Sequence, residues 1–404
     1  MRILHVTWSL DPHTGGPGNV IRNIVREQVR LGHEVVVVAT ATQIAEPRVS
    51  REEFVQRVSS EPDFQGAELY LGRAYGRRKP WSTFGFSPEC KRWIRRRLSD
   101  RKLAVDLIHI HGIFGHVLSV AAAQARRHSI PYLIEPYGGL DPNCLAMGSH
   151  RLKMIFARLI LRKDLRYAAY VHAASQMEAD YLCDWIPKER IRVIPHGVRI
   201  PAFDTGNASR NFLAAFPQLR GKQVILFMSR ITHKKRPEII VRAMARLRSE
   251  YPNLVLLLAG NDEGPLATVR AVAKEHGIED SIVHAGFLQG DLKRGAFAVA
   301  DLFALPSIDE NFGIAPMEAM AHGVPVLVTP GVASHVYVDK SGGGLTVEGT
   351  AEGFAEGIRK LLQADREAMG RRGREFLEKN LSWTSVARQI DDLYQESLAN
   401  TQTK

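Results

Sequence analysis

The chain has 404 residues, of which 45% are hydrophobic, so it is long enough to build two packed cores. Its three cysteines, Cys90, Cys144 and Cys183, are scattered and lack metal-ligand spacing, which argues against a disulfide framework and for a reducing compartment. A strand-like segment opens the chain, and no stretch approaches the roughly 20 apolar residues of a membrane-spanning helix. We expect a cytoplasmic protein that is neither exported nor integral to a membrane.

The formal net charge is +11, and all of the excess lies in the first half of the chain. Residues 1–200 carry 30 Lys and Arg against 19 Asp and Glu, whereas residues 201–404 carry 24 of each kind. Such an asymmetry suggests that one domain faces an anionic partner. The partner could be a bilayer surface, a nucleic acid or a phosphorylated acceptor, and charge alone does not choose among them.

The first predicted strand, Ile3–Thr7, leads through a loop to Gly15 and Gly16 and then to an amphipathic helix that ends near Leu31. Pro17, near the first helical position, suits the fixed φ of proline. A strand, a glycine loop and a helix start form a natural cradle for a phosphate group. A glycine turn needed only for tight packing is the alternative.

Two segments of the first half combine cations with apolar residues. Residues 91–102 place seven cations around one tryptophan and two aliphatic residues, and residues 151–166 form a strongly amphipathic basic helix. A solvated helix face or a helix packed on a core is the ordinary explanation. Contact with an anionic membrane surface is the sharper hypothesis, and it would place the protein peripherally on the inner face of the plasma membrane.

Two further strands of the first half end in polar groups. Val105–His111 ends in a histidine, and Ile130–Pro136 is followed by Tyr137 and Gly138. The carboxyl ends of parallel strands gather ligands in open α/β sheets. A lone histidine at a strand end is nevertheless more often a hydrogen-bonded structural residue than a catalyst.

In the second half, the buried-type strand Gln223–Met228 is followed by Arg230 and Lys235 and then by a helix. Cations between a strand end and a helix start are well placed to bind a diphosphate, although a solvated basic loop is equally compatible. Another strand ends at Gly286 and Phe287, and the aromatic ring is a candidate to frame a nucleobase.

The segment after Leu305 is a turn-rich loop that contains Glu310, and a helix from Ile314 to His322 follows it and carries Glu318. The unsatisfied amides at a helix start can donate to an anion or to a sugar hydroxyl, and each carboxylate can accept from a vicinal diol. An isolated pair of glutamates eight residues apart is more often one helix cap and one solvated side chain.

This loop and helix, with the sequence PS…ENFG…EAMAHGVPV, resemble the E-x7-E signature of the retaining glycosyltransferases of family four, which have the two-domain GT-B fold. The resemblance implies that Glu310 and the backbone of residues 311–314 hold the donor sugar, and that Glu318 holds the nucleotide ribose. The residues of that backbone segment are Asn311, Phe312, Gly313 and Ile314.

The resemblance extends to other positions. It implies that Gly15 and Gly16 approach the donor diphosphate, that His111 lies near donor or acceptor, and that Arg230 and Lys235 neutralise the departing nucleoside diphosphate. Two positions depart from the family pattern. Tyr137 stands where relatives often have a histidine that reaches the transferred sugar, beside the preserved Gly138, and Arg236 replaces a common glycine.

Strands alternate with helices throughout, which predicts an α/β protein of two doubly wound Rossmann-like domains. In the fold that the chain resembles, these domains face a cleft. We expect an acceptor-binding domain at residues 1–197, joined by a returning helix at 384–404, and a donor-binding domain at residues 198–383.

We therefore predict a retaining glycosyltransferase that uses a UDP- or GDP-sugar and a glycan or polyprenyl-diphosphate-linked acceptor, in polysaccharide or lipopolysaccharide biosynthesis. No D-x-D motif occurs, so no cofactor and no metal ion is needed to explain how the leaving group is stabilised. A nucleotide-sugar epimerase of the same architecture is the alternative. A nucleic-acid partner is not expected, because the basic half has no recognition motif.

Overall fold

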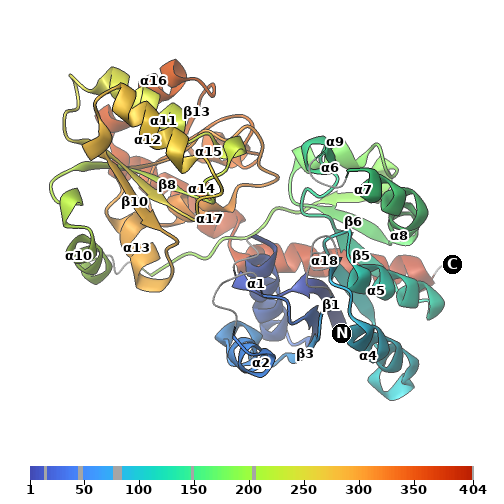
Figure 1. The fold of residues 1–404 in the computed structure, drawn as a ribbon. Helices are drawn as coiled ribbons and strands as arrows, with labels where there is room; N and C mark the ends of the chain where they lie inside the picture. The colour runs from blue at the N-terminus through green and yellow to red at the C-terminus, as the bar shows by residue number, and fades with distance from the viewer. Residues whose placement is uncertain (13–15, 44–48, 76–83, 147–149, 203–205, 403–404) are drawn as a thin grey trace. The chain divides into compact units, whose positions relative to one another are not determined.

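The computed structural model describes residues 1–12, 16–43, 49–75, 84–146, 150–202 and 206–402. The chain forms two compact units: unit 1 comprises Met1–Gly197 and Trp383–Lys404, and unit 2 comprises Val198–Ser382. Each unit is an α/β layer structure, with helices on both sides of a parallel sheet (Figure 1). The expected fold class, two doubly wound α/β domains, is confirmed.

Unit 1 contains a seven-stranded sheet in the order β3-β2-β1-β4-β5-β6-β7, in which every neighbouring pair is parallel. The strands are β1 (Arg2–Ser9), β2 (Glu34–Thr40), β3 (Glu68–Gly72), β4 (Leu107–His111), β5 (Tyr132–Glu135), β6 (Tyr170–Ala173) and β7 (Ile191–Val193). The helices are α1 (Gly16–Arg30), α2 (Arg51–Ser59), α4 (Pro88–Ser99), α5 (His116–Arg127), α6 (Pro142–Ala146), α7 (His150–Phe156), α8 (Arg162–Tyr167), α9 (Gln176–Leu182) and α18 (Trp383–Gln402).

Unit 2 contains a six-stranded parallel sheet in the order β10-β9-β8-β11-β12-β13. The strands are β8 (Gln223–Met228), β9 (Leu254–Ala259), β10 (Ile282–Gly286), β11 (Leu302–Leu305), β12 (Val326–Val328) and β13 (Gly344–Thr346). The helices are α10 (Gly206–Ala215), the short 3-10 turn η7 (His233–Lys235), α11 (Glu238–Leu247), α12 (Leu266–Glu275), α13 (Gly290–Ala298), α14 (Ile314–Ala321), α15 (His335–Ser341), α16 (Ala351–Gln363) and α17 (Arg366–Asn380).

The chain passes from unit 1 to unit 2 between Gly197 and Val198, at the position expected from the sequence. Trp383 corrects the expectation at the other boundary, because it begins α18 and belongs to unit 1 rather than to the second domain. A Cβ atom at Gly197 would lie 2.5 Å from Cδ2 of Trp383, so the indole packs directly on that glycine. This contact fixes the start of the returning helix within unit 1.

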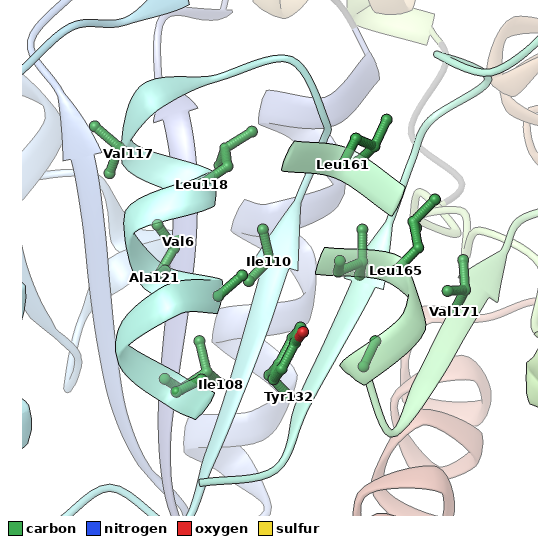
Figure 2. Packing of buried hydrophobic residues seen from close by; sticks show 14 of the residues in the cluster. Val6, Ile108, Ile110, Val117, Leu118, Ala121, Tyr132, Leu161, Leu165 and Val171 are labelled. Atoms are coloured by element: carbon green, nitrogen blue, oxygen red, sulfur yellow. The ribbon is translucent and has the colours of Figure 1, made fainter. Parts of the chain in front are cut away.

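The larger apolar cluster of unit 1 lies on one face of its sheet (Figure 2), and a smaller cluster on the other face packs Val35 and Val37 of β2 against α1 and α2. Val6, Ile108, Ile110 and Val171 point from β1, β4 and β6 toward the helices that cover this face. Side chains alternate between the two faces of a strand, so the residues next to these positions in the sequence point to the opposite face. Those residues are His5, His109, His111 and His172, all of which are buried.

The two basic segments differ in what they expose. In residues 91–102, Ile94 and Leu98 are part of the core, and Trp93 stacks on Tyr70 with ring centroids 5.0 Å apart. The apolar side of this segment is therefore used in packing, which is the ordinary explanation rather than the membrane hypothesis. No helix among the described residues is long and apolar enough to span a bilayer.

Residues 151–166 run from α7 through a π-helical turn, Ala157–Leu161, into α8. Ala157, Leu161 and Leu165 are buried in the core, but other apolar side chains of the segment point outward. The exposed fraction is 56% for Leu152, 55% for Ile155, 74% for Leu159 and 39% for Ile160. This exposed apolar strip is flanked by exposed cations, namely Arg151, Arg158, Arg162, Lys163 and Arg166.

Candidate functional site

The loop after β11 is fastened to the turn η7, which follows β8. The amide of Ile308 donates to the carbonyl oxygen of Lys234 at 2.9 Å, and Oγ of Ser307 lies 3.1 Å from the same oxygen. Beyond these bonds, the amide of Glu310 donates to the carbonyl oxygen of Gly331 at 2.8 Å. The two segments predicted to hold the donor are therefore joined through their backbones.

Lys235 and Glu310 form an ion pair at the centre of this arrangement. Lys235 is only 6% exposed, and the Ser307 hydroxyl donates to Oε1 of Glu310 at 3.1 Å, which is the oxygen that contacts the lysine. A buried charge requires a partner of opposite charge. Until a ligand anion binds, the Glu310 carboxylate is that partner. The structure thus brings together two residues that the sequence predicted separately.

Burial lowers the pKa of Lys235 to about 7, with the cations Lys234 and Arg230 acting in the same direction and Asp309 and Glu263 opposing them. Removal from water disfavours the charged form of an amine. A lysine with this pKa changes its charge near neutral pH, and an anion that binds beside it will favour the charged form.

Arg236 occupies the position where the family often has glycine. Its φ is +47°, in the left-handed region that glycine adopts most easily, so the local turn retains the shape that glycine would give. The side chain links two loops: its Nε donates to the carbonyl oxygen of Pro306 at 3.0 Å, and its Nη1 donates to the carbonyl oxygen of Gly349 at 3.2 Å. The departure from the family pattern therefore adds support to the donor loop.

The helix α14 begins immediately after Gly313, whose φ is +86°. A Cβ atom at this position would lie 2.6 Å from Cγ1 of Val332 and 3.1 Å from Oγ of Ser334, so a side chain has no room. The preceding Phe312 is 3% exposed, and its carbonyl oxygen accepts a hydrogen bond from the amide of Ser334 at 2.8 Å. The residues that precede Ile314 are held rigidly, so the first amides of the helix have fixed directions.

Two other predicted residues have partners that the sequence did not indicate. Nζ of Lys293, on α13, lies 2.7 Å and 2.9 Å from the two carboxylate oxygens of Glu318, and both side chains are partly exposed. Arg230 is more open, with 58% of its side chain exposed, and Nη1 lies 3.0 Å from Oε1 of Glu263. Lys293 and Glu263 belong to this group of residues, although no motif marked them.

Phe287 follows β10 and is 47% exposed, which leaves much of its ring available for contact with a ligand. The glycine before it, Gly286, has a φ of +68°. Asn311 lies in the loop between β11 and α14, next to the buried Phe312. Both predicted residues are therefore on the loops that follow strands of the unit 2 sheet.

In unit 1, Gly16 begins α1, as expected, whereas Gly15 lies outside the described residues. His111 is 1% exposed, and a hydrogen bond of 2.9 Å joins its Nδ1 to the hydroxyl of Tyr137. Tyr137 has a φ of +55°, and the amide of Gly138 donates to Oε1 of Glu178 at 2.6 Å. The residue that replaces the usual histidine is therefore in direct contact with His111.

His111 belongs to a larger buried group that the sequence analysis missed. A hydrogen bond of 2.8 Å joins its Nε2 to Nδ1 of His5, and Glu135 Oε2 lies 3.3 Å from its Nδ1. Burial opposes ionisation of Glu135, but His172, His111 and His196 together hold the pKa of that carboxyl well below its usual range. Burial and His111 lower the pKa of His5 to about 3. The sequence signal for this group was the alternation of histidine with isoleucine in LIHIH, which places both histidines on one face of the strand.

Two parallel-sheet α/β units, one of which carries a lysine–glutamate pair and a glycine-started helix at its strand ends, have the architecture of the GT-B glycosyltransferases. The comparisons agree. Residues 210–376 match the model for glycosyl transferases group 1, and residues 15–197 match the glycosyl transferase 4-like domain. The chain belongs to the group 1 glycosyltransferases.

Relatives and solved structures are consistent with this family. The chain is 24% identical over 411 residues to an uncharacterized glycosyltransferase of Methanocaldococcus jannaschii, covering 98% of each chain. It is 29% identical to a D-inositol 3-phosphate glycosyltransferase of Corynebacterium glutamicum, covering 52% of this chain and 53% of that one. The Anabaena protein HepE, solved with UDP and glucose, matches with a TM-score of 0.75 at 17% identity, covering 98% of this chain and all of that one.

The protein is therefore a glycosyltransferase, as the sequence analysis predicted. The alternative of a nucleotide-sugar epimerase finds no support, because the family models and the relatives are glycosyltransferases. The likeness to HepE at 17% identity supports the fold alone.

Proposed function

We propose that this glycosyltransferase transfers a sugar, with retention of configuration, from a UDP- or GDP-sugar bound by unit 2 to a hydroxyl of a glycan or lipid-linked acceptor. The observation that carries the proposal is the buried ion pair of Lys235 and Glu310, in which the lysine senses the charge of Arg230 and the glutamate precedes the start of α14 by four residues. Such a group can exchange one anion, its own carboxylate, for another, the diphosphate of the donor.

In this proposal, Lys235 and Arg230 bind the diphosphate and stabilise the charge that grows on it as the bond to the sugar breaks. Both cations are already paired with carboxylates, Glu310 and Glu263. A diphosphate carries more negative charge than either carboxylate and offers more acceptor oxygens, so it competes for both cations. Glu310, once released, accepts hydrogen bonds from the hydroxyl groups of the donor sugar.

The nucleoside is bound by the neighbouring side chains. Glu318 accepts from the two ribose hydroxyls after exchanging its contact with Lys293, whose Nζ lies 2.7 Å from one carboxylate oxygen. The exposed ring of Phe287 lies against the base. HepE, which has this fold at 17% identity, was solved with UDP, so UDP-sugars are tested beside GDP-sugars.

We propose further that the reaction needs no metal ion, because the protein's own cations neutralise the leaving group. Retention then follows from attack of the acceptor on the face that the diphosphate leaves, with a phosphate oxygen of the departing group accepting the proton of the acceptor hydroxyl. No protein side chain is required as a covalent nucleophile in this route.

In this proposal unit 1 binds the acceptor, with His111 and Tyr137 as the residues that contact it. An anionic acceptor fits the charge of residues 1–200, which carry 30 Lys and Arg against 19 Asp and Glu. The Corynebacterium relative is named for an inositol phosphate acceptor. The exposed apolar strip of residues 151–166, flanked by cations, suits the surface of an anionic bilayer, where a lipid-linked acceptor would reside.

The experiment that tests this function is release of nucleoside diphosphate from a panel of UDP- and GDP-sugars, with polyprenyl-diphosphate glycans, polysaccharide fragments or inositol phosphate as acceptors. We expect turnover with one nucleotide, dependence on an acceptor, and no loss of rate in EDTA. NMR of the product should show the anomeric configuration of the donor. An inverted product would overturn the retaining mechanism, and a loss of activity in EDTA that Mg²⁺ or Mn²⁺ restores would overturn the metal-free mechanism.

A further inference from the structure

Histidine and glutamate side chains form a layer on strands β1, β4, β5 and β6, on the sheet face opposite the apolar cluster of Figure 2. The strand register brings its members side by side: His5 on β1 pairs with His109 on β4, and His111 pairs with Glu135 on β5. His172 on β6 adjoins the same group, and its Nδ1 lies 3.6 Å from Oε2 of Glu135. The proposed sugar transfer assigns a role only to His111.

Three atoms of this layer converge on one another: Nε2 of His109, Oε2 of Glu135 and Nδ1 of His172. His109 Nε2 lies 3.9 Å from Glu135 Oε2, and all three atoms lie within 4.8 Å of one another. Each side chain is at most 1% exposed, and the two histidine nitrogens have no hydrogen-bond partner among the described residues, whereas Oε2 of Glu135 also lies 3.3 Å from Nδ1 of His111. Buried polar atoms are rarely left in this condition.

The other polar atom of each side chain is held by a neighbour. A hydrogen bond of 2.7 Å joins Nε2 of His172 to the carbonyl oxygen of Ile194, so Nε2 carries a proton and Nδ1 is the nitrogen left for a metal ion when the ring is neutral. Nε2 of His196 lies 2.7 Å from Oε1 of Glu135, and a hydrogen bond of 2.7 Å joins Nδ1 of His109 to the Tyr394 hydroxyl. Metal-binding histidines and carboxylates are held by outer contacts of this kind.

The separations distinguish a metal ion from a water molecule. Zinc bonds of about 2.0–2.1 Å in a tetrahedron hold neighbouring ligand atoms about 3.4 Å apart. A water molecule hydrogen-bonded at about 2.8 Å holds its tetrahedral partners about 4.6 Å apart. The observed separations of 3.6 Å and 3.9 Å are closer to the zinc value. They are also too long for direct hydrogen bonds between the side chains.

We propose that His109, Glu135 and His172 bind a divalent transition-metal ion of the zinc type in the interior of unit 1. Two imidazoles and one carboxylate are a usual ligand set for zinc, with a water molecule as the fourth ligand. The site requires the His109 tautomer in which Nδ1 donates to the Tyr394 oxygen, leaving Nε2 with its lone pair.

The ion would link β4, β5 and β6 and neutralise the carboxylate of Glu135 inside the unit. It would stabilise unit 1 rather than take part in sugar transfer, so it is independent of the metal-free reaction proposed for unit 2. His111, whose Nδ1 is bonded to Tyr137, is the member of the layer nearest to the proposed acceptor residues.

The first test uses the full chain with an affinity tag that contains no histidine. The protein is stripped with a chelator and titrated with Zn²⁺ or Co²⁺, and bound metal is measured by elemental analysis. We expect one equivalent of zinc, a higher melting temperature on binding, and a Co²⁺ absorption spectrum of tetrahedral type. Absence of saturable binding by the folded protein would overturn the proposal.

The second test uses His172→Gln and Glu135→Gln, with His322→Gln as the matched control. His322 is a largely buried histidine of unit 2 that also has a ring nitrogen without a hydrogen-bond partner in the part of the chain that the structure describes. The two site variants should lose at least about tenfold in zinc affinity, as ligand-site changes do, and the control should retain it. Retention of full affinity by both site variants would overturn the proposal. If these variants fail to fold, zinc-edge X-ray absorption of the wild type decides: imidazole and oxygen ligands support the site, and sulfur ligands contradict it.

Discussion

Lys235 and Glu310 come from different loops of unit 2, and their ion pair is fixed by the Ser307 hydroxyl, which donates to Oε1 of Glu310 at 3.1 Å. The pair keeps the lysine charge compensated without a ligand. A diphosphate can therefore enter by exchanging with the carboxylate, and no charge is left buried without a partner at any stage.

Replacement of this lysine should abolish most of the activity. Lys235→Ala removes a fixed cation from the leaving group, and loss of one such donor commonly lowers kcat by about 100- to 1000-fold. The variant should remain folded by circular dichroism. Lys234→Ala is the matched control, since it removes the same charge one residue away and should keep most of the turnover. Equal losses in the two variants would contradict a specific role for Lys235.

Donor binding should take up a proton above neutral pH. Lys235 has a pKa of about 7 because it is buried, so it is mostly neutral at pH 8 and mostly charged at pH 6. A bound diphosphate stabilises the charged form of Lys235. The binding of one donor molecule should therefore be accompanied by the uptake of close to one proton from solvent at pH 8 and of almost none at pH 6. Donor affinity should accordingly fall as the pH rises above 7.

Calorimetric titration of a nucleotide sugar in buffers of different ionisation enthalpy measures this uptake. A nucleotide sugar is the suitable ligand because its diphosphate does not titrate in this range. Lys235→Arg keeps a permanent charge and should show no uptake. Uptake of the same size in that variant would assign the proton to another group.

The glycine before α14 should be intolerant of a side chain. Gly313→Ala would place a methyl group 2.6 Å from Val332 at a φ of +86°, so both contact and backbone strain oppose it, and a loss of about 2–4 kcal/mol in the free energy of unfolding is expected. Gly323→Ala is the control, because Gly323 has a φ of +77° with open space around it. The control should lose only about 1 kcal/mol. Chemical denaturation measures the free energy of unfolding of both variants. Equal losses would contradict the prediction, because they would show that the contact with Val332 does not destabilise the protein.

At Arg236, replacement by glycine should destabilise the protein less than replacement by alanine, which reverses the usual order. Arg236→Ala and Arg236→Gly both remove the hydrogen bonds to Pro306 and Gly349, but only glycine adopts a φ of +47° without strain. The alanine variant should therefore be less stable by about 1 kcal/mol in urea denaturation. A less stable glycine variant would show that backbone strain at this position is negligible.

The exposed apolar strip should mediate membrane binding. Leu159 is 74% exposed, so Leu159→Asp should leave the melting temperature nearly unchanged while it weakens co-sedimentation with anionic vesicles by at least about fivefold. Leu31→Asp is the control, as Leu31 is 40% exposed on another part of unit 1. Identical sedimentation of both variants and the wild type would exclude the strip as the membrane contact.

The sequence predicted the fold and the members of the donor site because both depend on local patterns. Alternating strands and helices indicated two parallel sheets, and the segment from Glu310 to Glu318 follows a spacing known from the family. The contacts were not predictable, since the partner of Glu318 is Lys293 on a different helix and that of Arg230 is Glu263 on a different loop. Such pairs depend on how distant segments fold together.

The histidine layer was missed for a related reason. The strand LIHIH was recognised as a strand, but only the register of four strands shows that His5, His109, Glu135 and His172 share one face. The alternation in LIHIH places His109 and His111 on one face, but it does not show which residues of the other strands join them.

The central claim is that unit 2 binds a nucleotide-diphosphate sugar through Lys235 and Glu318. The most direct measurement is a thermal-shift titration of the wild type and Lys235→Ala with UDP, GDP, ADP and their sugar conjugates, because a ligand that binds only the folded protein raises its melting temperature. We predict a saturable rise with one nucleotide series that is lost in Lys235→Ala and retained in Lys234→Ala. The absence of a shift with any of them at millimolar concentration, or a shift that Lys235→Ala leaves unchanged, would contradict the account.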